Sequence, residues 1–373
     1  MTRRAPVIGI YGASGRAGAM VAAHLASRGY ALTLAGRRPD RISEVAALIG
    51  AASQAVGSGE RSLSAFTEEC RVVVNCAGPF VETAAPLARA CIATGTHYLD
   101  ISGERESVRG LCDLHRAAVA ARALVIPAAG AKGALGAWAL ALAASTGEVG
   151  PFDVAYAHEA SAYWTPSIAA LRSVAGEGAR WEAGRPAEYG PPPRRFDFPL
   201  PFAPGLAVHV SGVEEVALPG APHVRAARAW LSAGPGTLGN EAWGRLHDPM
   251  FAPMTRRAAP LLWRRLVAGT PGERAPLPTP RRGALAVVVR PSARDACDSV
   301  AIVAPDGYEA CVHVLGACVE RLLLAHDDQV GGVLPVAARF PAEEVLPPLV
   351  RAGAIDVLKG GRSRRSSRGE AVR

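Results

Sequence analysis

The sequence predicts an α/β protein that has a doubly wound parallel sheet in its N-terminal part and a second, α+β domain after it. Its 373 residues are about enough for two domains of ordinary size. Residues 1–130 alternate short β-branched runs with longer amphipathic stretches rich in Ala and Leu, which is the pattern of βαβ units around a parallel sheet. From Pro151 onwards the strand-like segments are separated by fewer helices, which favours a largely antiparallel sheet.

Six strands with helical crossovers are expected in the N-terminal part. They cover residues 7–11, 31–35, 54–56, 72–76, 97–101 and 123–127, and the pattern is weakest at 54–56. The helix over residues 16–28 ends at Gly29, and the helix after Phe80 ends at Gly95. Glycine is a natural residue for the left-handed position that follows a helix. Six strands connected in this way fit a doubly wound sheet.

The second part of the chain has five strand-like segments, one strong helix and one last helix. The expected strands cover residues 153–158, 208–216, 224–232, 283–290 and 299–304, and the expected helices cover residues 308–325 and 341–352. Proline-rich stretches at 191–193 and 270–280 indicate extended loops.

Charge and composition exclude several classes of protein. Most of the net charge of +8 lies after Leu358 and at Arg3 and Arg4, so the body of the chain is nearly neutral and lacks the broad basic face that nucleic-acid binding needs. No run of eighteen apolar residues is present, which argues against a membrane span. The seven cysteines form no CxxC pair, so neither a disulfide framework nor a metal site is indicated. We therefore expect a cytoplasmic protein that acts on small molecules.

A glycine motif follows the first strand directly and opens the first helix. In the stretch 12–18, Gly12 permits a tight turn, Gly15 lets a pyrophosphate approach the backbone, and Gly18 lets the helix lie close to the strand. The helix N-terminus adds unpaired N–H groups. A glycine pattern alone is weak evidence in a Gly-rich chain, but its place between strand and helix predicts a Rossmann-type dinucleotide site. The expected cofactor contacts in this loop are Gly12, Ser14, Gly15, Arg16 and Ala17.

The end of the second strand indicates which dinucleotide binds. A carboxylate there would hold the ribose hydroxyls of NAD, but this chain has Arg37 and Arg38, and no acidic residue until Asp40. Arginine binds phosphate through paired hydrogen bonds, so the pair favours the 2′-phosphate of NADP(H). The alternative is that both arginines are solvated loop residues.

Three further loops are expected to line the ligand site, because ligands lie over the carboxyl ends of parallel strands. These loops cover residues 75–80, 100–104 and 128–133. Asn75 is either a nicotinamide ligand or an ordinary turn residue. The expected cofactor contacts here are Asn75, Cys76, Ala77, Gly78, Pro79, Gly103 and Gly130.

These segments together resemble a known family. The stretches 12–18, 35–37, 74–80 and 95–100, followed by Gly103-Glu104, are similar to the NADP-binding domain of saccharopine-dehydrogenase-like oxidoreductases, particularly the branch that contains trans-acting enoyl reductases. Gly307-Tyr308 before a long helix and the stretch 332–335 resemble the closing region of that family more weakly. After the sixth strand the chain departs from the family, because it has 130–133 (GAKG) where an aromatic and an acidic residue with a proline are typical.

The resemblance implies a division of the chain. Residues 1–145 would form the NADP-binding domain, residues 146–330 a substrate and dimerisation domain of a homodimer, and residues 331–358 a segment that returns to the first domain. The composition of residues 359–373 indicates a disordered basic tail.

Lys132 is the first candidate for a catalytic residue. The chain has two lysines, Lys132 and Lys359, among 41 Lys and Arg residues, so arginine is its ordinary cation. A lysine in a glycine-rich loop beside the expected nicotinamide site suggests a role in proton transfer, because a partly desolvated ammonium releases its proton more easily. The alternatives are a phosphate contact and a position without function. Tyr98 and Tyr163 are the other catalytic candidates, with Glu104 and His158 as weaker ones.

An aromatic cluster opens the second domain. It consists of Tyr156, His158, Glu159, Tyr163 and Trp164, and it forms either a substrate wall or part of the core. Trp138 is expected in the core.

Two functions remain open from the sequence. The first is an NADPH-dependent reductase that transfers hydride to a C=C or C=N bond of a biosynthetic metabolite, either a free small molecule or one bound to a carrier. The second is a non-catalytic NADP-binding sensor or partner protein, because a dinucleotide fingerprint indicates binding rather than chemistry.

Overall fold

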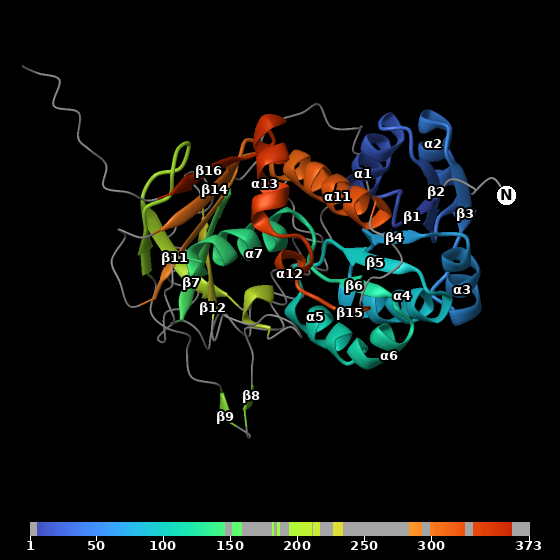
Figure 1. The fold of residues 1–373 in the computed structure, drawn as a ribbon, viewed down its shortest axis with the longest axis horizontal. Coiled ribbons are helices and arrows are strands. Elements are labelled where there is room, and N and C mark those ends of the chain that lie inside the picture. Colours follow the sequence, from blue (N-terminus) through green and yellow to red (C-terminus); the bar gives the residue numbers. More distant parts are fainter. Residues whose placement is uncertain are drawn as a thin grey trace, which may run out of the picture.

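The structure, a computed structural model, describes residues 6–145, 151–158, 181–182, 185–186, 194–210, 212–216, 227–233, 283–292, 299–324 and 331–359. Tyr163, Cys297 and the two proline-rich loops lie outside these residues. Figure 1 shows the two sheets on opposite sides of the molecule, with α7 and α13 between them. Within the described ranges, no helix is both long and apolar enough to cross a membrane.

The first sheet has seven parallel strands. They are β1 (Val7–Tyr11), β2 (Ala31–Gly36), β3 (Ala52–Ala55), β4 (Val72–Asn75), β5 (His97–Asp100), β6 (Leu124–Ile126) and β15 (Gly332–Val333), in the order β15-β6-β5-β4-β1-β2-β3. The strand order reverses between β1 and β4, which both pair with parallel register. The predicted Rossmann-type parallel sheet is confirmed, and its seventh strand comes from the C-terminal region.

Helices cover both faces of this sheet. They are α1 (Arg16–Ser27), α2 (Pro39–Ile49), α3 (Glu60–Glu68), α4 (Phe80–Thr94), α5 (Arg105–Cys112) and α6 (His115–Ala120). Because side chains alternate along a strand, Ile8 and Ile10 of β1 face the core of α1 and α2, whereas Tyr11 faces α3 and α4. The carboxyl ends of β1, β4, β5 and β6 therefore meet at one edge between two helical layers.

The second sheet is mixed. It contains β7 (Phe152–His158), β10 (Arg194–Phe196), β11 (Gly205–Val210), β12 (Ala227–Ala233), β13 (Leu285–Pro291), β14 (Val300–Ala304) and β16 (Asp356–Lys359), in the order β10-β11-β12-β7-β13-β14-β16. Only the β12 and β7 pair is parallel among these strands. Strands β8 (Trp181–Glu182) and β9 (Arg185–Pro186) pair separately.

The strand expected over residues 208–216 is wrong in its second half. Strand β11 ends at Val210, and a 3-10 turn, η1 (Val213–Glu215), follows it. The reason is local, because Glu215 turns back to His209 of β11, with 2.8 Å between its Oε1 and the imidazole Nε2. A strand would carry these two side chains away from each other.

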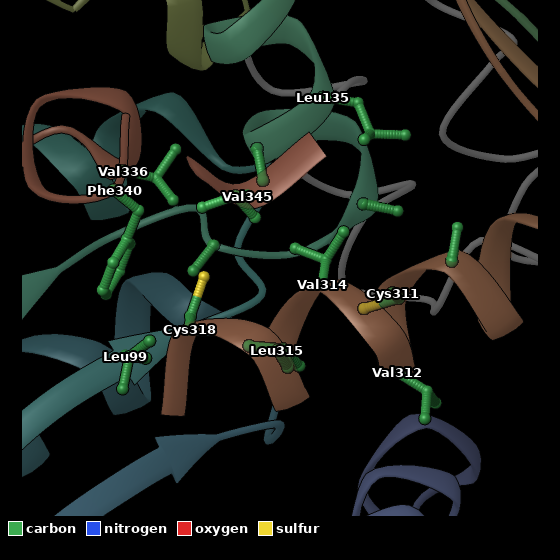
Figure 2. Close-up of a cluster of buried hydrophobic side chains, with 14 of the residues drawn as sticks. Leu99, Leu135, Cys311, Val312, Val314, Leu315, Cys318, Val336, Phe340 and Val345 are labelled. Atoms are coloured by element: carbon green, nitrogen blue, oxygen red, sulfur yellow. The ribbon is translucent and has the colours of Figure 1, made fainter. Parts of the chain in front are cut away.

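One core joins the two sheets. Helix α7 (Ala131–Ala144) leaves the edge of the first sheet and packs on β13 and β14 of the second. Helices α11 (Gly307–Leu324), α12 (Val336–Arg339) and α13 (Ala342–Arg351) pack against α7. Figure 2 shows Val314 and Cys318 of α11 in the same cluster as Leu135 of α7 and Val345 of α13. Trp138 of α7 is fully buried, as expected, and its indole N–H donates to the carbonyl of Phe340 at 2.8 Å.

The C-terminal segment contributes to both sheets. Strand β15 pairs with β6 in parallel register, whereas β16 pairs with β14 in antiparallel register. Between them, α12 and α13 pack against α7. The segment 331–358, expected to return to the first domain, thus also supplies an edge strand of the second sheet.

Candidate functional site

The glycine loop between β1 and α1 is closely packed on one side and open on the other. Gly12 has a φ of +84°, and a Cβ there would lie 2.7 Å from the backbone nitrogen of Ala77. A Cβ on Gly18 would clash with the carbonyl of Gly12, so only glycine lets α1 begin this close to β1. A Cβ on Gly15 would meet that carbonyl at 3.3 Å and no other described atom within 4 Å. The open face of the loop is therefore at Gly15.

The first turn of α1 is suited to binding an anion. No side chain caps the helix N-terminus at Gly15, and Ser14, Arg16 and Ala17 lie in the same turn. Uncapped N–H groups and the helix dipole attract a phosphate at this point. The Arg16 guanidinium lies 4.2 Å above the ring of Tyr308 at the start of α11, so this turn also contacts α11.

Two arginines extend from the end of β2. Arg37 and Arg38 are both exposed, and they follow directly on the strand beside β1. Burial raises the pKa of Tyr11 at the end of β1, and the nearby positive charge of Arg37 opposes this rise. Asp40 is the first acidic residue of the region and lies in the first turn of α2. The electrostatics of this corner favour a phosphate over a ribose diol.

Asn75 at the end of β4 uses its amide within the protein. Its Nδ2 donates to Tyr98 Oη at 3.0 Å and to Thr83 Oγ1 at 3.3 Å, and its Oδ1 accepts from the N–H of Ala77 at 3.0 Å. These contacts favour the turn-residue alternative over a nicotinamide ligand. Asn75 shapes the loop that contains Cys76, Ala77, Gly78 and Pro79, and all four of these residues are partly buried.

Glu104 caps helix α4 and is not available as a proton donor. Its Oε1 accepts from the N–H of Phe80 at 3.1 Å, and its Oε2 accepts from the N–H of Val81 at 2.9 Å. A carboxylate at this place satisfies the helix N-terminus. Gly103, beside it, is exposed, whereas Gly130 is buried against Ile101.

Tyr98 and Asp100 form a buried pair on β5. The hydroxyl of Tyr98 donates to Asp100 Oδ2 at 2.9 Å, and both residues are fully buried. Asp100 Oδ1 accepts from the N–H groups of Ser102 at 2.9 Å and Ala128 at 2.8 Å. Burial raises the pKa of Asp100 to about 6, and these hydrogen bonds act against that rise. Because its hydroxyl is enclosed in this network, the expectation that Tyr98 donates a proton to substrate finds no support in the geometry.

Lys132 lies in the first turn of α7, directly beyond the end of β6. Its side chain is partly buried, and burial lowers its pKa from 10.5 to about 8, although the charge of Glu214 acts in the opposite direction. The hydroxyl of Tyr156 on β7 contacts the backbone oxygen of Lys132 at 3.3 Å and donates to the carboxylate of Glu214. Burial raises the pKa of both Tyr156 and Glu214. Three titratable groups from two domains therefore meet at the carboxyl edge of the first sheet.

A second group of charges borders this cluster. Glu215, next to Glu214 in η1, contacts His209, and its Oε2 lies 4.0 Å from Arg105 Nη1 at the start of α5. The side chains of Arg105 and Glu215 are each 15% exposed. The turn η1 is thereby joined to both the first and the second domain. In the described part of the chain, no group of His, Cys, Asp and Glu is arranged to hold a metal ion.

Comparisons with known proteins agree with this geometry. Residues 8–167 match the family model described as the saccharopine dehydrogenase NADP binding domain. Residues 8–167, which are less than half of this chain, are therefore similar to a saccharopine dehydrogenase NADP-binding domain. The glycine loop and the two arginines after β2 lie within the matched residues. NADP(H) is the cofactor that this part of the chain binds, as the sequence predicts.

Two curated relatives share part of the NADP-binding domain. A trans-acting enoyl reductase of Mycobacterium leprae is 39% identical over 130 residues, which are 32% of this chain and 31% of that protein. A putative trans-acting enoyl reductase of Mycobacterium tuberculosis is 35% identical over 130 residues, with the same shares. The chain thus matches about a third of the length of these relatives.

A solved structure extends the likeness to the second domain. Apo saccharopine dehydrogenase (L-Glu forming) of Saccharomyces cerevisiae matches with a TM-score of 0.61 over 95% of this chain and 100% of that chain. The sequences are 10% identical, so this match shows the fold alone.

The NADP-binding domain fits its cofactor at both ends. The open face at Gly15 and the uncapped turn of α1 would receive the pyrophosphate, and Arg37 with Arg38 would receive the 2′-phosphate. The expected individual contacts remain predictions.

Sequence reasoning missed Asp100 and Glu214 as site residues. Asp100 is the last residue of β5 and the first residue of the expected ligand-lining loop 100–104, but it was not selected as a site residue, although that position is a signal that it points into that edge. Glu214 had no such signal, because residues 213–215 were expected to continue a strand. Tyr156 was expected in an aromatic cluster, and the structure places it at Lys132. The other cluster members beyond His158 lie outside the described residues.

Proposed function

We propose that this chain is an NADPH-dependent reductase that saturates a conjugated C=C bond of an acyl substrate, with Lys132 as the proton donor. The observation that carries the proposal is the position of Lys132, directly beyond β6 of an NADP-binding domain. The pKa of its side chain is lowered, and Tyr156 and Glu214 are its neighbours. The name of the curated relatives supports reduction of an enoyl group over reduction of an imine.

The protein residues have separate tasks in this scheme. The glycine loop and Arg37 hold the dinucleotide, which when bound supplies the hydride. As the β-carbon of the substrate gains hydride, the electron pair of the C=C bond moves toward the carbonyl oxygen, and Lys132 Nζ delivers a proton to the α-carbon or to that oxygen. Tyr156 holds the first turn of α7 through the backbone oxygen of Lys132, and Glu214 places a negative charge near the Lys132 side chain.

The opposing effects on Lys132 suit a proton donor. Burial makes the ammonium a stronger acid, and the carboxylate of Glu214 keeps it from losing its proton altogether. With a pKa of about 8, about nine tenths of the Lys132 side chains are still protonated at pH 7. The donor is therefore both acidic enough to react and largely protonated at neutral pH.

We extend the proposal to the rest of the chain. Residues 1–145 act as the NADP-binding domain, residues 146–330 bind the acyl substrate and join two chains in a homodimer, residues 331–358 link the parts, and residues 359–373 are a tail. A carrier protein presents the substrate, as the words "trans-acting" in the name of the relatives suggest. Light scattering of the purified chain tests the dimer.

The test of the function is transfer of deuterium from cofactor to product. NADPH that carries deuterium at C4 is incubated with a crotonyl thioester of pantetheine, and the saturated product is analysed by mass spectrometry. We expect one deuterium at the β-carbon, and a loss of the product in Lys132→Met. NADPH binding without label in the product would overturn the reductase proposal in favour of a sensor. Label that appears only with a cyclic imine would overturn the choice of C=C.

A further inference from the structure

We propose that Asp100 is a positioning residue that places Lys132 by holding the turn between β6 and α7. The inference deepens the proposed function, because it explains how the proton donor is oriented. It concerns residues 127–130, which connect β6 of the first sheet to α7, the helix that carries Lys132 in its first turn.

Asp100 holds this turn through side chain and backbone together. Its Oδ1 accepts from the N–H of Ala128 at 2.8 Å, and its backbone oxygen accepts from the N–H of Ala129 at 2.7 Å. The same Oδ1 accepts from the N–H of Ser102 at 2.9 Å. One buried residue thus fixes two consecutive amides at the start of the turn and one amide of the neighbouring loop.

The turn has little freedom beyond these bonds. Ala128 has a φ of +54°, a region that residues with a side chain rarely adopt. A Cβ on Gly130 would lie 3.0 Å from the Cβ of Ile101, and a Cβ on Gly133 would clash with the carbonyl of Ala128. Lys132 lies between these two glycines, so its backbone position follows from where Ala128 is held.

The carboxylate of Asp100 is itself held in one orientation. Its Oδ2 accepts from Tyr98, whose hydroxyl accepts from Asn75 Nδ2, and Asn75 in turn binds Thr83 of α4. A buried carboxylate is costly unless its oxygens are fully hydrogen-bonded, and this network meets that need. The network joins the ends of β4, β5 and β6, which are the strands that flank the expected nicotinamide position.

The two lysines of the chain allow a test that needs no substrate. Acetic anhydride reacts with neutral amines, and mass spectrometry of peptides separates Lys132 from the exposed Lys359, which serves as the internal reference. With a pKa of about 8, about half of the Lys132 amines are neutral at pH 8, against about 0.3% for an amine with a pKa of 10.5. The ratio of the two labelling rates therefore reports the environment of Lys132.

Three variants of the β5 region make the test specific. Asp100→Ala removes the acceptor of the Ala128 amide, and we expect the ratio of Lys132 to Lys359 labelling at pH 8 to change at least tenfold. Asp100→Asn keeps one carbonyl acceptor without charge, and we expect a change of about threefold. Thr96→Val is the matched control, because buried Thr96 Oγ1 donates to Thr67 and Cys70 carbonyls at the opposite end of β5. We expect it to leave the ratio unchanged.

Unchanged labelling in folded Asp100→Ala and in Asp100→Asn would overturn the inference. If Asp100→Ala does not fold, Asp100→Asn decides alone, and hydrogen exchange of residues 128–132 in that variant should be faster than in wild type. A ratio that Thr96→Val changes as much as Asp100→Asn would equally overturn it, because loss of stability would then be the cause. Failure of the proposed reductase activity leaves these results unaffected, so the two proposals fail separately.

Discussion

Replacing Lys132 by Met keeps the length of the side chain and removes its ammonium. The pKa of Lys132 is about 8 against an ordinary 10.5, so its proton is released about 300-fold more easily than that of an exposed lysine, which corresponds to about 3 kcal/mol. A general acid contributes about 10²-fold to 10⁴-fold to a rate. We therefore expect turnover to fall by about 10²-fold or more, while affinity for NADPH changes by less than about twofold.

The assay follows the loss of NADPH absorbance with an enoyl thioester between pH 6 and pH 10. In wild type, turnover should fall as pH rises through about 8, because Lys132 loses the proton that it must donate. Lys132→Met should lack this decline. Lys132→Arg is the matched control for charge, and it should be nearly as slow as Lys132→Met, because a guanidinium holds its proton too tightly.

Near-normal turnover in Lys132→Arg would refute the reasoning, since a positive charge alone would then be enough. Near-normal turnover in Lys132→Met would refute any role of Lys132 in the reaction. In either case the affinity for NADPH, measured by fluorescence titration, separates a loss of chemistry from a loss of cofactor.

Three further predictions concern the cofactor and the contact of α1 with α11. Arg37→Asp should weaken NADPH binding at least about tenfold and NADH binding far less, and equal losses in a fluorescence titration would remove Arg37 from the 2′-phosphate site. Gly15→Val should abolish NADPH binding without loss of the fold, because the side chain points to the open face of the loop, whereas Gly18→Val should not fold. Circular dichroism measures the fold and titration measures NADPH binding. Near wild-type binding by Gly15→Val would contradict the fingerprint. Burial lowers the pKa of His24, and so does the neighbouring His313, whose ring centroid lies 5.0 Å from that of His24. The free energy of unfolding should therefore fall as pH decreases below about 6.5. A urea midpoint that falls equally with pH in His24→Leu would contradict this cause.

The first sheet could be predicted because its signals are local. Strand, glycine loop and helix follow one another within residues 7–27, and each element has its own hydrophobic period. Strand β15 has two residues, and only its pairing with β6 defines it. No pattern within a two-residue strand could have identified that partner.

The cofactor could be predicted from the sequence, whereas the surroundings of Lys132 could be predicted only in part. Lys132 was identified because lysine is rare in this chain, but its partner Glu214 is 82 positions away and lies in a turn that has the sequence pattern of a strand. Asn75 was expected to be either a nicotinamide ligand or a turn residue, and Tyr98 was a candidate proton donor, whereas the structure uses both in the network around Asp100. Residue type and loop position cannot distinguish a side chain that faces a ligand from one that supports the loop beneath it.

The C-terminal segment supplies β15 to the first sheet and β16 to the second, so neither sheet can be completed before this segment has been synthesised. Strand β15 follows β6 by about 200 residues in the chain, so the ribosome must make all of these residues before the edge of the first sheet beside β6 can be closed. Helices α11 and α13, which cover α7, emerge at the same late stage. A nascent chain that ends before them contains the glycine loop but leaves the apolar surface of α7 exposed, and such exposed surface favours aggregation.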